Sequence, residues 1–238
     1  MNSTRKIAVI TGVIFIIATV ASLSAAALTP DQTGTGYLTR FSAHPNQVAA
    51  GALLYLVAAF ASAGIAIAMY PVMRRSNAGL ALGSVIFRAL ETVFYIFGVV
   101  SLLSLLTLGQ QFTKAGAADR TSLLAIGDLL VSVHDHAALV AVFAFCLGAF
   151  MYYYLFFQSR LLPRWLSGFG IVAIILMLTA CVLALFSGNL ITSYIPLAFP
   201  IFLQEMVMAV WLIVKGFNPS AIRSQSTKPT MNELLRAA

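Results

Sequence analysis

The sequence predicts an all-α, polytopic membrane protein: a bundle of six hydrophobic helices with both chain ends on the cytoplasmic side. Three observations support this fold class. The chain of 238 residues is 61% hydrophobic and 9% charged, whereas ordinary soluble domains are about 25% charged. Six apolar runs each reach the length of about 20 residues that a helix needs to cross about 30 Å of hydrocarbon. The basic residues gather in the connections on one side of these runs, which is how membrane proteins set their orientation.

Each span is predicted from an apolar run bounded by polar or turn-forming residues. The runs cover residues 7–28, 47–72, 80–108, 137–157, 166–188 and 194–214. The first run follows the basic segment 1–6 and ends in small residues at 24–27, so it also resembles a signal peptide with a cleavage site. Its apolar stretch is longer than a usual signal core, which favours a retained helix. Cleavage would leave five spans with unchanged orientation.

The connections and the end of the chain carry weaker signals. Residues 29–46 and 109–136 are long enough for an interfacial helix each, and in the second segment apolar residues recur at roughly helical spacing between 123 and 133. The spans form one domain, residues 1–214. Residues 215–238 are predicted to be a polar cytoplasmic tail, mostly disordered because it is poor in apolar residues, with a short amphipathic turn at 231–238.

The distribution of Lys and Arg predicts the orientation. Three basic residues lie on the side of the long connections, namely Arg40, Lys114 and Arg120. Ten lie on the opposite side: Arg5, Lys6, Arg74, Arg75, Arg160, Arg164, Lys215, Arg223, Lys228 and Arg236. This excess, in short loops, places the ten-residue side in the cytoplasm. Five aromatic residues are expected as interfacial anchors at the same boundary: Tyr152, Tyr153, Tyr154, Trp165 and Trp211.

Composition and motifs argue against several classes of function. The net charge of +7 forms no single basic stripe of the kind that carries phosphate contacts, so no nucleic-acid partner is expected. Cys146 and Cys181 both fall inside apolar runs and allow neither a disulfide framework nor a metal motif. The sequence has no nucleophile elbow, zinc-protease motif or phosphate-binding loop, so an enzyme is the less favoured class.

Several segments carry a resemblance to a known family. They are RKIAVITGVIF at the start, NQVAAGALLYL, IAIAMYPV, LGSVIFRALETVFYIFGVVSLLSLLTLGQQF, FCLGAFMYYYLFFQSRLLPRW and VWLIVKGFNPSAI. Together they resemble the bacterial domain-of-unknown-function family 4386 over nearly the whole chain. The resemblance implies a six-helix protein of the bacterial cytoplasmic membrane and implies no activity.

Three ionisable residues lie at one predicted depth inside the membrane. Arg88 and Glu91 lie about 12 and 16 Å along the third run from its cytoplasmic end, and Glu205 lies about 14 Å from the same side in the sixth. Arg88, Glu91 and Tyr95 share one helix face. That face must point to the bundle interior or a cavity, because a charge facing lipid costs about 2.5–3.5 kcal/mol. Pro200 precedes Glu205 and frees a backbone carbonyl, and such sites bind protons or cations in transporters.

The histidines form a second candidate site at the outer boundary. His44, His134 and His136 are the three histidines of the chain, and Asp135 lies between two of them. Imidazole and carboxylate ligands suit zinc or another divalent metal ion. However, positions i and i+2 on a helix point about 200° apart, so His134 and His136 share a metal only if the segment is extended or bent.

These sites lead to three hypotheses, each with its own structural requirement. The leading one is a binding or transport protein for a small solute, ion or lipid, without a cofactor, which requires a cavity that reaches Glu91 or Glu205. The alternative is a membrane-embedded metal-dependent hydrolase, which requires the three histidines around one point, with Zn–N distances near 2.1 Å. The third is a structural or regulatory membrane protein, in which Arg88 is fully paired with a carboxylate and no cavity adjoins. Membrane lipids are the expected partners in every case.

Overall fold

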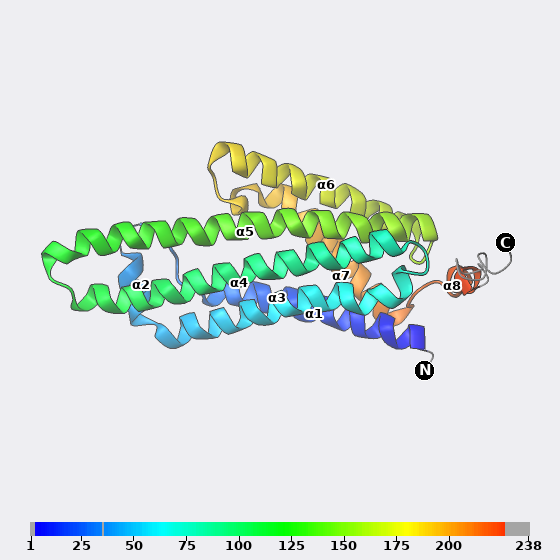
Figure 1. Cartoon of the computed structure of the whole chain (residues 1–238), viewed down its shortest axis with the longest axis horizontal. Helices are drawn as coiled ribbons and strands as arrows, with labels where there is room; N and C mark the ends of the chain where they lie inside the picture. Colours follow the sequence, from blue (N-terminus) through cyan, green and yellow to red (C-terminus); the bar gives the residue numbers. More distant parts are fainter. Residues whose placement is uncertain (1–2, 35, 227–238) are drawn as a thin grey trace, which may run out of the picture.

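The computed structural model describes residues 3–34 and 36–226, which form helices and no strand (Figure 1). Six helices in this part of the chain are long and apolar enough to cross a membrane. They are α1 (Ser3–Leu28), α3 (Pro45–Met73), α4 (Ala78–Lys114), α5 (Ala117–Ser159), α6 (Arg164–Ser187) and α7 (Ile195–Val214, preceded by the short 3₁₀ helix η1, Ile191–Tyr194). Two shorter helices are α2 (Tyr37–Ala43) and α8 (Pro219–Ser226). The predicted all-α, six-span architecture is confirmed.

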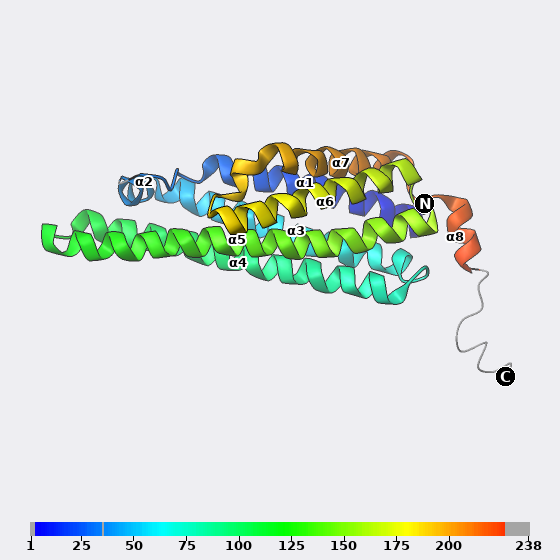
Figure 2. The same cartoon turned by 90° about the horizontal axis from the view of Figure 1, so that it is seen from above.

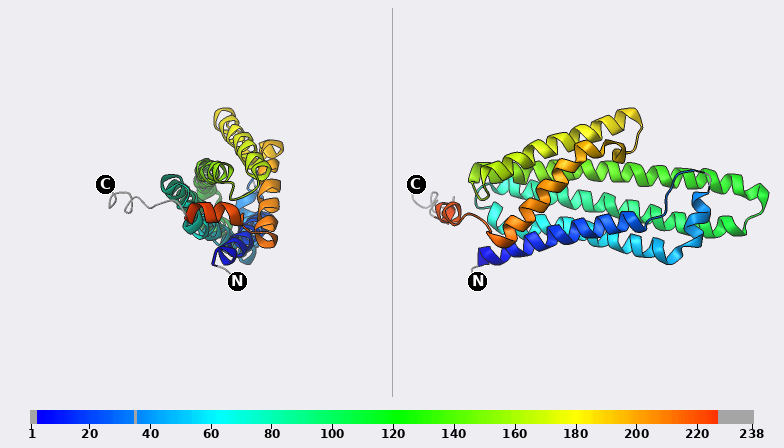
Figure 3. Two further views of the ribbon diagram at one scale, coloured as in Figure 1. Left: turned by 90° about the vertical axis from the view of Figure 1, so that its right-hand side faces the viewer. Right: turned by 180° about the vertical axis from the view of Figure 1, so that it is seen from behind.

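The six long helices close into a ring. Contacts run from α1 to α3, α3 to α4, α4 to α5, α5 to α6, α6 to α7 and from α7 back to α1. The start of α1 and the end of α7 lie at the same end of the bundle, where α8 lies across it (Figures 1 and 3). An even number of spans requires this arrangement of the ends. It leaves one central volume that all six helices can reach.

Helix α4 has two chemically distinct faces. Between residues 82 and 100 its large exposed side chains are apolar and recur every three or four residues, as in a lipid-facing stripe: Leu82, Ile86, Leu90, Val93, Phe97 and Val100. The opposite face is buried and carries the polar residues Ser84, Arg88, Glu91 and Thr92. In water this pattern would be inverted. In lipid it is the pattern that removes charge from hydrocarbon.

Helices α4 and α5 are much longer than predicted. At 1.5 Å per residue, their 37 and 43 residues span about 55 and 65 Å, roughly twice the hydrocarbon thickness. Figures 1 and 2 show the pair as a hairpin that extends beyond the other helices. The prediction of a separate interfacial helix within residues 109–136 is therefore wrong, because this segment continues the two spanning helices on either side of a turn. Its helical spacing was correctly recognised.

The connection at residues 29–46 does carry a separate helix, α2, as predicted. Helix α2 packs against the hairpin through Tyr37, Leu38 and Phe41, all of which are buried. Two glycines permit the close approach, because a Cβ at Gly109 or Gly127 would collide with Leu38 or Tyr37. The hydroxyl of Tyr37 donates a hydrogen bond of 2.9 Å to Asp128 on α5. This helix therefore braces the base of the projecting hairpin.

Two predictions need correction at the basic end of the bundle, which is the end that carries most of the Lys and Arg residues together with the start of α1 and the end of α7. Residues 219–226 of the expected disordered tail form α8, because the backbone N–H of Asn218 donates to the carbonyl of Leu161 at 2.9 Å and Ala221 is buried against the core. The proposed turn at 231–238 lies outside the described residues. Of the expected tyrosine anchors, Tyr152 and Tyr153 are fully buried and only Tyr154 is exposed.

Candidate functional site

A cavity of about 250 Å³, with charged side chains in a largely apolar wall, lies within the ring of helices. All six long helices contribute to its wall. The lining side chains are Ala18, Thr19, Ser22 and Leu23 of α1, Ala58 and Ser62 of α3, Arg88, Glu91 and Tyr95 of α4, Val142 and Phe145 of α5, Met177 of α6, and Ala198, Ile201, Phe202 and Glu205 of α7. The cavity is not sealed. Leu23 and Phe202 are exposed at the surface, so its opening lies beside α1 and α7.

Arg88 and Glu91 form an ion pair at the wall of this cavity. Nη1 of Arg88 lies 3.1 Å from Oε2 of Glu91, and the two side chains are 3% and 6% exposed. The residues are three apart on α4, so they lie one turn apart on the same face. Because the pair lies within one helix, it does not by itself join two helices, and it adjoins a cavity, which the structural hypothesis excluded.

The guanidinium of Arg88 is held in place from two further sides. Its Nε donates to the backbone carbonyl of Ser62 on α3 at 3.4 Å, and its Cζ lies 4.9 Å from the centre of the Phe145 ring on α5. Nearby, the hydroxyl of Thr92 donates to the carbonyls of Ala59, at 2.8 Å, and of Arg88, at 3.0 Å. The cation is therefore fixed by a helix on each side of α4. These contacts hold the positive charge of Arg88 at the wall of the cavity.

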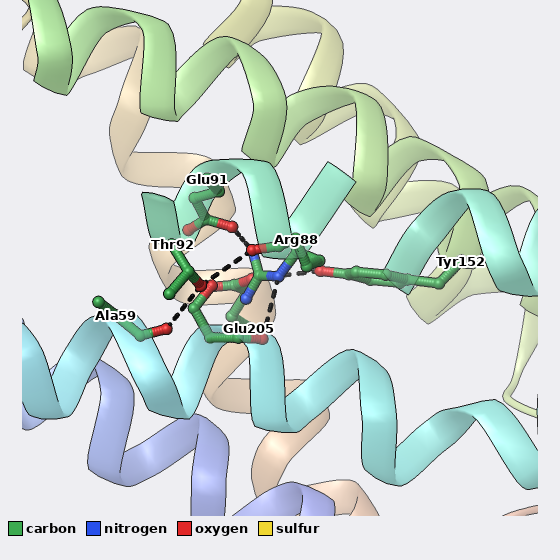
Figure 4. Close-up of polar contacts among 7 residues, drawn as sticks. Ala59, Arg88, Glu91, Thr92, Tyr152 and Glu205 are labelled. Carbon is green, nitrogen blue, oxygen red and sulfur yellow. Dashed lines mark hydrogen bonds and ion pairs between the residues drawn. The ribbon is translucent and has the colours of Figure 1, made fainter. Parts of the chain in front are cut away.

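Glu205 brings a second carboxylate to the same cavity from α7. Figure 4 shows it beside Arg88, with Glu91 on another side of the guanidinium. Its Oε1 accepts a hydrogen bond of 3.3 Å from the hydroxyl of Tyr152 on α5, and its side chain is only half-buried. Pro200 lies inside α7 one turn earlier and has no N–H to pair with the carbonyl of Pro196.

The charges of the cluster do not balance. One guanidinium faces two carboxylates, so the fully ionised cluster carries one net negative charge. An unbalanced charge at low dielectric is costly. Glu205 is the carboxylate of the cluster without an ion pair within the described residues. A proton or a small cation at Glu205 would neutralise the cluster.

The four residues predicted for the intramembrane site all line this one cavity: Arg88, Glu91, Tyr95 and Glu205. Sequence reasoning missed the tyrosines of α5. Tyr152 bonds to Glu205, and Tyr153 donates to the amide oxygen of the fully buried Gln204. The available signal was that Gln204 and Glu205 are adjacent polar residues in an otherwise apolar run, and such residues need partners on a neighbouring helix.

The three histidines do not assemble into a metal site among the described residues. Nδ1 of His134 lies 2.9 Å from the carbonyl of Gly98, and Nδ1 of His136 lies 2.7 Å from the carbonyl of Ser132 on its own helix. Within residues 3–34 and 36–226, no group of three His, Cys, Asp or Glu side chains is placed to hold a metal ion. His44, at the junction of α2 and α3, and Asp135 complete no such group. The hydrolase hypothesis therefore gains no geometric support.

Comparison with known proteins identifies a family and no close relative of known activity. The model of a family described as a domain of unknown function, DUF4386, matches residues 10–216. No curated protein and no solved structure matches significantly. The matched segment contains all six long helices from the first turns of α1 onward, and with them the whole lining of the cavity.

Proposed function

The chain belongs to the DUF4386 family, and we propose that it is a transport protein that binds a proton or another small cation in its intramembrane cavity. The single observation that carries the proposal is a cavity of about 250 Å³ that touches a buried ion pair and an additional, unpaired carboxylate. Ionisable residues inside a membrane most often mark ion or substrate pathways. A purely structural ion pair would need no adjoining cavity.

The size of the cavity limits the solute. A volume of about 250 Å³ has room for a cluster of water molecules. Drug-sized ligands use pockets of about 300–1,000 Å³. A hydrated cation, a proton with its waters, or a solute of a few non-hydrogen atoms fits this space.

The polar groups of the cavity have separable roles in this proposal. Glu205 accepts the proton or cation, because it is half-buried at the cavity wall and lacks an ion-pair partner in the described chain. Tyr152 orients its carboxylate through the 3.3 Å hydrogen bond. Arg88 pairs with Glu91 and limits the excess negative charge of the cluster to one unit. The half-buried hydroxyl of Tyr95 offers a further ligand to a bound solute.

The proposed location is the bacterial cytoplasmic membrane. The ten Lys and Arg residues predicted to be cytoplasmic support an orientation with both chain ends inside. In that orientation the α4–α5 hairpin projects on the outer side, and the opening beside Leu23 lies in the outer half of α1.

Proton flux into vesicles tests the proposal. The purified protein is reconstituted into liposomes that contain a pH-sensitive dye, and a potassium gradient with valinomycin sets the membrane potential. We expect the interior of the vesicles to acidify only when the protein is present, and we expect Glu205→Gln to abolish this acidification. The substitution keeps the shape of the side chain and its hydrogen bond from Tyr152, but it removes the ionisable group. Asp119→Asn, at an exposed position in the first turn of α5, is the matched control and should transport normally.

If protons do not move, vesicles prepared without valinomycin are tested with sodium and with potassium. The proposal is refuted if Glu205→Gln carries each of the three ions as fast as the wild-type protein does. Flux lost equally in Glu205→Gln and Asp119→Asn would also refute it, because the effect would then not belong to the cavity.

A further inference from the structure

A second, larger cavity of about 630 Å³ lies at the basic end of the bundle. It is formed where the α5–α6 connection meets the end of α7 and the start of α8. Its lining includes three cationic side chains, Arg160, Arg164 and Lys215, together with Trp211 and Asn218. It is separate from the intramembrane cavity described above and shares no lining residue with it.

No described acidic side chain balances these three cations. Arg160, Arg164 and Lys215 form no ion pair within the described residues. Two of them rest on aromatic faces instead: Cζ of Arg164 lies 5.4 Å from the Phe157 ring centre, and Nζ of Lys215 lies 4.6 Å from that of Trp211. All three cations are exposed, so the cavity presents unneutralised positive charge to its surroundings.

The backbone adds to this positive potential. Helix α6 begins at Arg164 beside the cavity, and its N-cap residue, Pro163, makes no side-chain capping bond. Leu166 and Ser167 already donate their N–H groups to the carbonyl of Pro163, which leaves the N–H groups of Arg164 and Trp165 to an anion, and the helix dipole favours negative charge there. The cavity thus combines side-chain cations with a helix N-terminus.

Arg160 occupies a backbone position that suits glycine better. Its φ is +57°, and among the described residues it is the one residue other than glycine with a positive φ. Asn218 stabilises this backbone conformation of Arg160, because its side-chain amide donates a hydrogen bond of 3.2 Å to the carbonyl of Arg160. A strained non-glycine residue of this kind points to a role for its side chain, and here the side chain lies at the cavity.

An apolar groove continues from this cavity along α7. The groove has a volume of about 430 Å³ and is lined by Met206, Val207, Val210, Trp211, Val214 and Lys215. Trp211 and Lys215 line both spaces. Trp165 stands edge-on to Trp211 with ring centres 6.1 Å apart, as aromatic residues do at headgroup level. Positive charge at one end and an apolar wall at the other match the two parts of a phospholipid.

We propose that this cavity and groove form a binding site for one anionic phospholipid, with the phosphate between Arg160, Arg164 and Lys215 and an acyl chain along α7. Basic pockets between membrane helices on the cytoplasmic side recognise anionic headgroups. A free phosphate would satisfy the cations but would leave the adjoining groove empty, so the continuity of the two spaces favours the lipid.

Lipid binding to the full chain tests the site. The protein in dodecyl maltoside is titrated with dioleoyl phosphatidylglycerol or dioleoyl phosphatidylcholine, and bound lipid is counted by native mass spectrometry. We expect the anionic lipid to bind more tightly than the zwitterionic one. Each cation removed should weaken phosphatidylglycerol binding about fivefold, so Arg164→Gln with Lys215→Gln should weaken it about 25-fold and leave phosphatidylcholine binding unchanged.

Two further variants separate a loss of lipid binding from a loss of folding. Arg160→Gly removes a cation and relieves the positive φ, so it should weaken phosphatidylglycerol binding about fivefold while the melting temperature does not fall. Arg75→Gln, an exposed position in the α3–α4 connection at the same end, is the matched control and should bind normally. Equal binding of both lipids, or an equal loss in Arg75→Gln, would overturn the proposal. So would inorganic phosphate raising the melting temperature as much as phosphatidylglycerol at equal concentration.

Discussion

Arg88 is the one cation among the described side chains that line the intramembrane cavity, so its replacement isolates the contribution of the ion pair. Arg88→Met removes the charge and keeps most of the apolar stem. It leaves Glu91, whose side chain is 6% exposed, facing Glu205 without a counter-ion. The perturbation therefore converts a paired cluster into two carboxylates in one low-dielectric space.

The expected loss of stability follows from the geometry of the pair. At an effective dielectric constant of 20, opposite charges about 4 Å apart attract by about 4 kcal/mol. Removing one partner of a buried ion pair usually costs about 3–5 kcal/mol, because the remaining charge stays buried. Arg88→Met should therefore lower the free energy of unfolding by about 3–5 kcal/mol. Arg88→Met combined with Glu91→Leu should recover to within about 1 kcal/mol of the wild type, since well-packed apolar pairs replace buried ion pairs at little cost.

Equilibrium unfolding by sodium dodecyl sulfate in mixed micelles, followed by tryptophan fluorescence, measures these free energies. The two single variants and the double variant form a cycle whose coupling energy belongs to the Arg88–Glu91 interaction. A loss below about 1 kcal/mol in Arg88→Met, as for solvated pairs, would refute the buried, low-dielectric cluster. The double variant also separates stability from function: it should fold well and still fail to transport, because the solute site has lost two of its polar groups.

Three further predictions concern packing and hydrogen bonds elsewhere. Gly12→Val should destabilise the bundle by about 1–3 kcal/mol in thermal unfolding, because a Cβ there would lie 2.6 Å from a carbonyl oxygen of α7; an unchanged melting temperature would contradict the α1–α7 packing. Tyr153→Phe should cost about 1–3 kcal/mol by leaving the buried amide oxygen of Gln204 without a donor, whereas Tyr154→Phe at the exposed neighbour should cost almost nothing. Burial and the Asp128 carboxylate raise the pKa of Tyr37, so its contribution to stability is complete below the unfolded value of about 10 and is lost as pH rises above it. The melting temperature of the wild type should therefore fall more as pH rises through about 10 than that of Tyr37→Phe, and an equal fall in the two proteins would contradict the Tyr37–Asp128 contact.

The six spans and the polar face of α4 were predictable because the bilayer imposes a simple rule on sequence. Apolar residues must face lipid over about 20 residues, and charged residues must turn away from it. Arg88 and Glu91 are spaced for one helix face, and Glu205 matched them in depth. These two constraints placed all three residues at one cavity, although neither constraint specifies which helices are neighbours.

The hairpin and the tyrosines were not predicted, for different physical reasons. Residues 109–136 are too polar for a span but remain good helix formers, and hydropathy does not distinguish a continued helix from a separate one at the interface. The tyrosines at 152–154 could have been assigned better. Consecutive helix residues point about 100° apart, so three of them cannot all face the lipid boundary. Tyr152 and Tyr153 turn inward to Glu205 and Gln204, and Tyr154 alone faces outward.

These paired contacts also restrict how the cavity can open. Adjacent tyrosines of α5 donate hydrogen bonds to adjacent residues of α7. Nε2 of Gln204 in turn donates a hydrogen bond of 3.2 Å to the carbonyl of Leu166, in the first turn of α6. A sliding movement of α7 against α5 would break both tyrosine bonds together and leave buried polar groups unpaired, at about 1–3 kcal/mol each. The opening of the cavity, by contrast, lies beside two apolar side chains, Leu23 of α1 and Phe202 of α7. Access to Glu205 is therefore expected through movement of the part of α1 that contains Leu23, with α5, α6 and α7 as the fixed part of the ring.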